Sequence, residues 1–121
     1  RVLLAEDNDI NAEIVMDMLK SSNIKCIRTK NGQDAVKAEK RHDFDVILMD
    51  CQMPIMDGHT ASRLIREEGR NKDKVKIIAL TANAFIEDKN ACLEAGMNAH
   101  LSKPIRKQVL FDCIARELAS V

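Results

Sequence analysis

Three acidic side chains stand directly after two apolar runs of the sequence. Glu6 and Asp7 follow residues 2–5, and Asp50 follows residues 46–49. If these runs are neighbouring strands of a parallel sheet, their carboxyl ends bring the three carboxylates to one edge. Like charges held close together raise each other's pKa and destabilise the fold, and a bound cation removes that penalty. Two carboxylates with water suit Mg²⁺, so Asp7 and Asp50 are candidate metal ligands with Glu6 beside them.

Two further polar residues stand at the ends of later runs. Thr81 ends the run 76–81, and its hydroxyl can donate to a phosphoryl oxygen. Lys103 follows residues 99–102, and its ammonium can pair with Asp50 and later with a phosphate. Either residue alone would be an ordinary strand-end threonine or surface lysine. Together with the acidic cluster they indicate a site for a metal ion and a phosphoryl group.

The segments that must position these residues alternate along the chain between short β-like runs and helical patterns. The expected strands are residues 2–6, 24–29, 45–49, 76–81 and 99–102. The expected helices lie near residues 9–22, 32–41, 58–68, 85–95 and 106–119. This alternation predicts an α/β fold, a parallel sheet with helices on both faces. A chain of 121 residues suffices for one domain, residues 1–121, and is too short for two.

Strand composition predicts the order within the sheet. Residues 2–5, 46–49 and 77–80 are apolar throughout, as in strands buried on both faces. Residues 24–29 alternate and residues 99–102 are mixed, which is typical of edges. The order 2-1-3-4-5 with right-handed crossovers satisfies both observations. Such a doubly wound sheet opens a crevice at the carboxyl ends of its first and third strands, where the acidic residues stand.

The first helix shows an apolar face. Ile10, Ile14, Val15 and Met18 share one side of residues 9–22. Asn8 precedes the helix and is a suitable N-cap.

Composition argues against several classes of partner. Acidic and basic residues balance at 19 each, which does not favour nucleic acid or an anionic membrane. The chain lacks Trp and Tyr, which does not favour an aromatic platform for stacking on bases. No apolar run approaches the roughly 20 residues of a membrane span, and no signal peptide is visible. The expected location is the cytoplasm, either alone or as the cytoplasmic part of a membrane-anchored protein.

The cysteines and histidines do not show the spacing of a zinc site. The cysteines are Cys26, Cys51, Cys92 and Cys113. The histidines are His42, His59 and His100. No C-x-x-C pair occurs, and three of the cysteines lie in apolar segments, which favours reduced and buried thiols. A zinc site is therefore not predicted.

Taken together, these motifs resemble the receiver domain of the two-component response-regulator family, over essentially the full chain. The matching motifs are Glu6-Asp7, the run LMDCQMPIMDG at 48–58, Thr81-Ala82 and Lys103-Pro104. Their order and spacing are specific as a set. The resemblance implies a flavodoxin-like fold with Mg²⁺ or Mn²⁺ as cofactor. It implies a phosphoacceptor switch, which phosphorylates and dephosphorylates itself, rather than a turnover enzyme.

The resemblance implies a role for each matching position. Asp50 corresponds to the aspartate that accepts a phosphoryl group from a phosphohistidine. Asp7 corresponds to the direct metal ligand and Glu6 to its partner, which usually acts through water. The backbone carbonyl of Gln52 corresponds to the third protein ligand. The side chains of Gln52 and Asn83 stand where they could limit water access to an acyl phosphate.

The later motifs correspond to the residues that respond to phosphorylation. Thr81 and Lys103 match the residues that contact the phosphoryl group. Pro104 matches a proline that often follows a cis peptide bond. His100 is a departure, because many relatives carry Tyr or Phe there as a switch residue. A histidine can fill the same space but can also carry charge, and it can equally be a plain surface residue.

The implied partners are a histidine kinase or a histidine phosphotransfer domain. The string Glu6-Asp7-Asn8 with Asn11 resembles receivers of hybrid sensor histidine kinases. The alternative parent is a stand-alone or transcription-factor response regulator. A homodimer through the fourth helix, fifth strand and fifth helix is a further expectation.

Other interpretations fit the residues less well. A magnesium-dependent phosphatase acting through an aspartyl phosphate would carry a second Asp where this chain has Gln52. An FMN-binding module would need a Ser/Thr/Gly-rich phosphate loop after the first strand, where Glu6, Asp7 and Asp9 would repel phosphate. An interaction module that has lost phosphorylation is not favoured, because the key side chains are all present.

Overall fold

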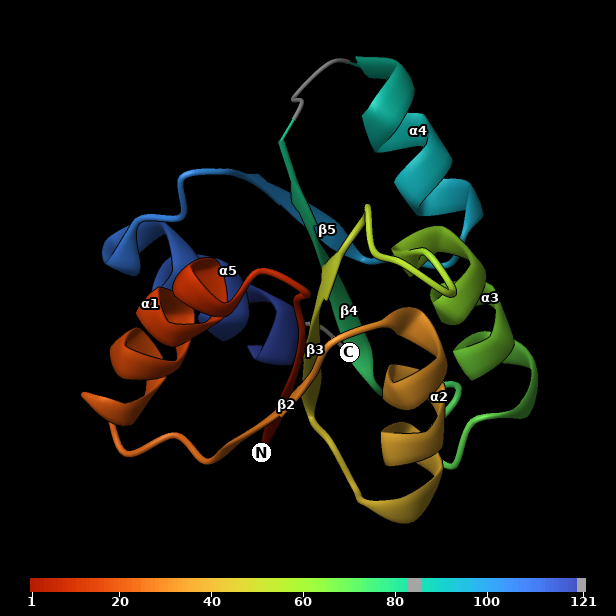
Figure 1. Ribbon diagram of the computed structural model, residues 1–121, viewed down its shortest axis with the longest axis horizontal. Helices are drawn as coiled ribbons and strands as arrows, with labels where there is room; N and C mark the ends of the chain where they lie inside the picture. The colour runs from red at the N-terminus through yellow and green to blue at the C-terminus, as the bar shows by residue number, and fades with distance from the viewer. Residues whose placement is uncertain (83–85, 120–121) are drawn as a thin grey trace.

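The structure is a computed structural model that describes residues 1–82 and 86–119, the side chains of 86–88 excepted (Figure 1). Within this part of the chain, strands and helices alternate as the sequence predicts. The strands are β1 (Val2–Ala5), β2 (Cys26–Thr29), β3 (Val46–Asp50), β4 (Lys76–Thr81) and β5 (Ala99–Ser102). The helices are α1 (Asp9–Lys20), α2 (Gly32–Arg41), α3 (Gly58–Glu68), α4 (Ile86–Glu94) and α5 (Lys107–Ala119). No helix in the described ranges has both the length and the apolar character of a membrane span.

All strands are parallel, and their order is β2-β1-β3-β4-β5, which confirms the predicted topology. The register aligns their carboxyl ends. Ala5 lies beside Met49, Asp50 lies beside Leu80, and Thr81 lies beside Ser102. Every residue of β1 and β3 is buried, whereas every residue of β2 is only half-buried. The fold is therefore the doubly wound, flavodoxin-like arrangement, with β2 and β5 at its edges.

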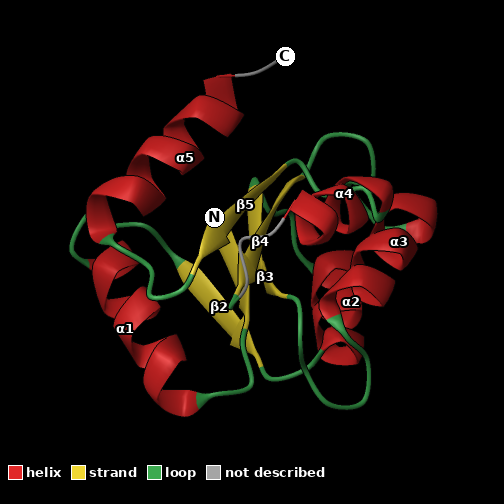
Figure 2. Cartoon of the chain, turned by 90° about the horizontal axis from the view of Figure 1, so that it is seen from above, coloured by secondary structure: helices red, strands yellow, loops and turns green. Residues whose placement is uncertain are grey.

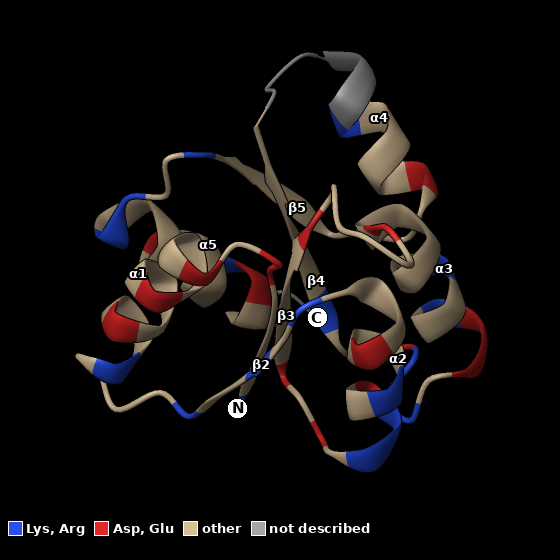
Figure 3. Ribbon diagram, viewed as in Figure 1, with Lys and Arg blue, Asp and Glu red and all other residues tan. Residues whose placement is uncertain are grey.

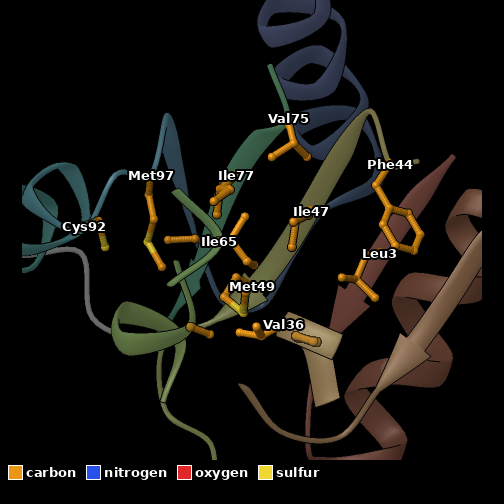
Figure 4. Close-up of a cluster of buried hydrophobic side chains, with 14 residues drawn as sticks. Leu3, Val36, Phe44, Ile47, Met49, Ile65, Val75, Ile77, Cys92 and Met97 are labelled. Atoms are coloured by element: carbon orange, nitrogen blue, oxygen red, sulfur yellow. The ribbon is translucent and has the colours of Figure 1, made fainter. Parts of the chain in front are cut away.

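The sheet separates two apolar layers. Figure 2 shows α1 and α5 on one face and α2, α3 and α4 on the other. Successive strand residues serve opposite layers, because side chains alternate along a strand. On β3, Ile47 joins the cluster under α2 to α4, and Leu48 joins the cluster under α1 and α5. Figure 4 shows the first of these clusters, which Ile65 of α3 and Cys92 of α4 complete.

Side-chain caps begin three of the helices at the carboxyl edge of the sheet. The Asn8 side chain accepts from the N–H of Asn11 at 2.9 Å, which confirms the predicted cap of α1. Asn31 caps α2 in the same way, and Asp57 caps α3. A cap of this kind contributes about 1 kcal/mol. The caps also fix the loops that leave β1, β2 and β3 at this edge.

The apolar face of α1 differs from the expectation. Val15 is buried, together with Ala12 and Leu19, at spacings of three and four residues. Ile10 and Ile14 stay 71% and 49% exposed. The helix thus rests on a narrow stripe that includes a small alanine, and two large side chains of the predicted face are left in solvent.

Gly58 sits where α3 approaches the end of β3. Its N–H donates to the carbonyl of Cys51 at 3.1 Å. A Cβ at this position would collide with the main-chain carbonyl of Asp50 and would lie 3.0 Å from Cγ of Met49. Only glycine leaves room for this contact, so the residue helps to set the position of Asp50.

We expect Gly58→Ala to lower the free energy of unfolding by about 1–3 kcal/mol, because the added methyl forces the backbone of Asp50 to move. Urea unfolding of the chain measures this loss. Arg63→Ala, an exposed site in the same helix, should change stability by no more than about 0.5 kcal/mol. If Gly58→Ala were as stable as the unaltered chain, residue 58 and the backbone of Asp50 would not be in tight contact.

Candidate functional site

Three carboxylates meet at the carboxyl edge of the sheet. Glu6 and Asp7 follow β1, and Asp50 ends β3. One oxygen from each lies within 4.8 Å of the others. Glu6 and Asp50 are buried, at 1% and 5% exposure, while Asp7 is open to solvent. Figure 3 shows acidic residues at the ends of both strands. The side chains that the sequence placed at one edge therefore do converge.

Lys103 reaches this cluster from the end of β5. Its Nζ lies 3.3 Å from Oδ2 of Asp50, the pairing that the sequence predicts. The same Nζ also lies 3.2 and 3.3 Å from the two carboxylate oxygens of Glu6, a contact that the sequence did not reveal. Burial by itself lowers the pKa of Lys103, but the charges of Asp50 and Glu6 outweigh it and raise that pKa. The ammonium is therefore charged at neutral pH.

One ammonium does not balance the buried acids. Burial raises the pKa of Glu6 from its ordinary 4.5 to about 7, and the nearby Asp50 adds to the rise. Lys103 offsets only part of it. A group of oxygen donors with surplus negative charge is what a hard divalent cation such as Mg²⁺ binds. The donor set and its charge thus fit the predicted metal.

Backbone groups hold Asp50 and its neighbours. The N–H of Gln52 donates to Oδ1 of Asp50 at 3.2 Å, and the N–H of Cys51 donates to the carbonyl of Leu80 at 3.2 Å. On the next strand, the carbonyl of Thr81 accepts from the N–H of Lys103 at 2.8 Å. The strand ends are therefore tied to one another as well as to the sheet.

The cluster opens into a cleft of about 690 Å³. Its lining includes the predicted metal and phosphoryl residues: Glu6, Asp7, Asp50, Gln52, Thr81 and Lys103. His100 is half-buried on β5 opposite Ala79, and the described residues that line the cleft do not include it. Asn83 lies outside the described residues. The Lys103–Pro104 peptide bond is cis, as the resemblance implies.

Sequence reasoning missed several residues of the cleft. Asp57 and His59 also line it, and Cys51 does so beside Asp50. His59 and Cys51 in turn approach Cys92 of α4, so that one ring nitrogen or Sγ atom from each lies within 4.8 Å of the others. These three residues belong to separate segments, and no local spacing connects them.

Comparisons with known proteins agree with this arrangement. A family model for the response regulator receiver domain matches residues 2–115. The chain is 44% identical over 119 residues to the hybrid signal transduction histidine kinase M of Dictyostelium discoideum. The match covers 95% of this chain but only 5% of that protein, so the chain spans a small part of such relatives.

Solved structures give the same result. One is the receiver domain of the sensor histidine kinase PA1611 from Pseudomonas aeruginosa, with a magnesium ion coordinated in its active-site cleft. It has a TM-score of 0.91 and 41% identity, and the match covers 98% of this chain and 97% of that one. Another is a complex of the histidine phosphotransfer protein Ypd1 with the receiver domain of Ssk1 from Saccharomyces cerevisiae. It has a TM-score of 0.90 and 33% identity, and the match covers 98% and 88% of the two chains.

The raised pKa of Glu6 makes the effect of a metal depend on pH. Below pH 4.5 the Glu6 carboxyl is protonated in both the folded and the unfolded chain, so no buried charge at Glu6 destabilises the fold. As the pH rises through about 7, the buried carboxyl of the metal-free chain ionises and this stability is lost. We therefore expect Mg²⁺ to raise the Tm more at pH 8 than at pH 6, where the proton on Glu6 competes with the ion.

Thermal unfolding with excess Mg²⁺ and with excess chelator measures this difference at each pH. Glu6→Gln should remove most of the pH dependence, whereas Glu13→Gln, an exposed change on α1, should keep it. An equal Mg²⁺-induced shift at both pH values in the unaltered chain would argue against a shared proton and metal site.

Proposed function

Since the chain belongs to the response regulator receiver domain family, we propose that it accepts a phosphoryl group on Asp50 within a two-component phosphorelay. One observation carries this proposal. Asp50 is almost buried at the crevice of the sheet, paired with Lys103 and surrounded by Glu6 and Asp7. We further propose that residues 1–121 form a single domain of this kind.

The proposed cofactor is Mg²⁺, with Mn²⁺ as an ion of similar ligand preference. Glu6, Asp7, Asp50 and the backbone carbonyl of Gln52 would hold it. When bound, such an ion neutralises charge on the oxygens of a transferring phosphoryl group. The magnesium ion in the cleft of the similar PA1611 receiver supports this assignment.

Asp50 is the proposed nucleophile. One of its carboxylate oxygens attacks the phosphorus of a phosphohistidine, the P–N bond breaks, and an acyl phosphate forms on Asp50. The ammonium of Lys103 lies 3.3 Å from Oδ2 of Asp50, so it can contact the incoming phosphoryl oxygens with little movement. Because Glu6 also contacts this ammonium, at 3.2 Å, Lys103 is positioned before the donor arrives.

The acyl phosphate is the proposed signal. It adds about 1.5–2 negative charges to a nearly enclosed site. The hydroxyl of Thr81, at the adjoining end of β4, would donate to the phosphoryl group and draw the surface near β4, α4 and β5 into a second state. His100 on β5 stays the candidate switch residue, coupled to this movement through the β4–β5 pairing.

The proposed donor is a histidine kinase or a histidine phosphotransfer domain, as the Ypd1 complex of the Ssk1 receiver supports. An apolar surface for such a partner adjoins the site. Ile10 and Ile14 of α1 are exposed, and Ile14 lines a hollow together with Ile105. The same hollow also includes Glu6 and Lys103, so a partner docked there would lie next to Asp50.

The proposed parent is a hybrid sensor histidine kinase, with a stand-alone or transcription-factor regulator as the alternative. The similarity to the hybrid kinase of Dictyostelium discoideum supports the first. The receiver would then lie in the cytoplasm, where kinases have access to ATP. A homodimer through α4, β5 and α5 stays a prediction.

Acetyl phosphate with Mg²⁺ should add one phosphoryl group to the chain, as read by intact mass. Asp50→Asn should abolish the addition, because it removes the nucleophile, and a chelator should prevent it. Asp57→Asn is the matched control, since asparagine also caps a helix and this residue lines the same cleft. Full phosphorylation of Asp50→Asn would contradict the assignment.

If the donor protein docks on α1, a change there should slow transfer from that protein without affecting the chemistry at Asp50. Ile14→Asp should slow phosphotransfer from a histidine phosphotransfer protein by about tenfold or more, the usual size of an interface hot spot. Its reaction with acetyl phosphate should not change. Leu118→Asp, a similarly exposed apolar site on α5, is the control and should leave both rates unchanged. Parallel losses with both donors would show that Ile14 acts on the fold instead.

A further inference from the structure

Three side chains with soft donor atoms meet beside the acidic cleft. Cys51 follows Asp50 at the end of β3, His59 lies in the first turn of α3, and Cys92 lies on α4. The two Sγ atoms are 3.9 Å apart, and Sγ of Cys92 is 3.6 Å from Nε2 of His59. One donor atom from each of the three residues lies within 4.8 Å of the others.

These separations are close to those of a tetrahedral zinc site. Zn–S bonds of about 2.3 Å and Zn–N bonds of about 2.0–2.1 Å are usual there. At the tetrahedral angle, such bonds place two sulfurs about 3.8 Å apart and a sulfur and a nitrogen about 3.6 Å apart. The distance between the sulfurs of Cys51 and Cys92 is within about 0.1 Å of this value, and that between Cys92 and His59 matches it. The donor atoms of Cys51 and His59 lie within 4.8 Å of each other, so closing this third distance is the rearrangement that a bound ion would require.

Burial and charge also favour a thiophilic cation. Cys92 is 2% exposed, whereas Cys51 and His59 are half-buried and both line the cleft, which gives an ion a route from solvent. Two thiolates cancel the charge of a divalent ion, so the complex would carry no net charge where Cys51 and Cys92 pack against the apolar core. A water molecule from the cleft can take the fourth position.

We propose that Cys51, His59 and Cys92 bind a thiophilic divalent cation, with Zn²⁺ as the expected ion. The site uses other donor atoms than the oxygen-lined cluster of Asp7 and Asp50. Sulfur and imidazole donors select zinc, whereas carboxylates select Mg²⁺, so the two sites should bind different ions. A bound ion ties the segment that follows Asp50 to α3 and α4. The proposal does not depend on phosphorylation of Asp50.

Zinc binding can be measured on the 121-residue chain, since a similar receiver was crystallised at nearly the same length. The chain is kept reduced with a phosphine, and Mg²⁺ is present in excess to occupy the acidic cluster. Titration with Zn²⁺ against a chromophoric chelator should show one equivalent bound. Co²⁺ in its place should give thiolate-to-cobalt charge-transfer absorption, and zinc should slow amide exchange in α4.

Variants assign the ligands. Cys51→Ser, Cys92→Ala and His59→Asn should each weaken zinc binding by about 100-fold or more, since even outer-shell partners of a metal cost about 10–100-fold. Cys113→Ala, on the opposite layer of the core, should bind as the unaltered chain does. Asp50→Asn should also retain zinc. If Cys92→Ala fails to fold by circular dichroism, the partly exposed His59→Asn and Cys51→Ser still decide the question.

Four results would overturn the proposal. The first is no zinc binding by the reduced chain. The second is binding that survives all three ligand variants, and the third is binding that is lost in Asp50→Asn, which would place the ion in the acidic cluster. A thiol count two below the expected four in the reduced chain would identify a disulfide and would also overturn it.

Discussion

The repulsion among Glu6, Asp7 and Asp50 is the constraint on which the site depends. Two of these carboxylates are buried, and among the described residues it is the ammonium of Lys103 that contacts both. Removing charged groups from water costs free energy that such a pairing does not always restore. A sequence selected for stability alone would gain from apolar side chains at this point. The surplus negative charge instead suits the cleft to the proposed cation, and the close approach of Gly58 helps to set the position of Asp50.

The sequence predicts the framework of this site well, because strand position follows from patterns that are local. Runs buried on both faces identify β1, β3 and β4, and their carboxyl ends place Asp50 near Lys103. Local patterns of this kind do not predict the contacts that depend on how the helices pack. The exposure of Ile10 and Ile14 depends on how α1 rotates against the sheet. The meeting of Cys51, His59 and Cys92 depends on side chains from three segments, so ligand spacing along the chain gave no sign of it.

The end of β3 stands between two chemically different environments. Asp50 belongs to a group of carboxylates and an ammonium, and the next residue, Cys51, belongs to a group of two thiols and an imidazole. The backbone makes this possible, because consecutive residues at a strand end turn toward different layers of the molecule. Both residues line the cleft, but Cys51 also packs against the layer of α2, α3 and α4, where it contacts Cys92. The residue that contacts α4 therefore directly follows Asp50 in the chain.

The three capped helices have an electrostatic consequence. Because α1, α2 and α3 all begin at the carboxyl edge, the positive ends of their macrodipoles lie on the side of the sheet that carries the acids. Each is equivalent to about half an elementary charge. The backbone itself therefore makes this edge more receptive to an anion than its side chains suggest, which would help a pocket rich in carboxylates to admit the proposed dianionic phosphoryl group.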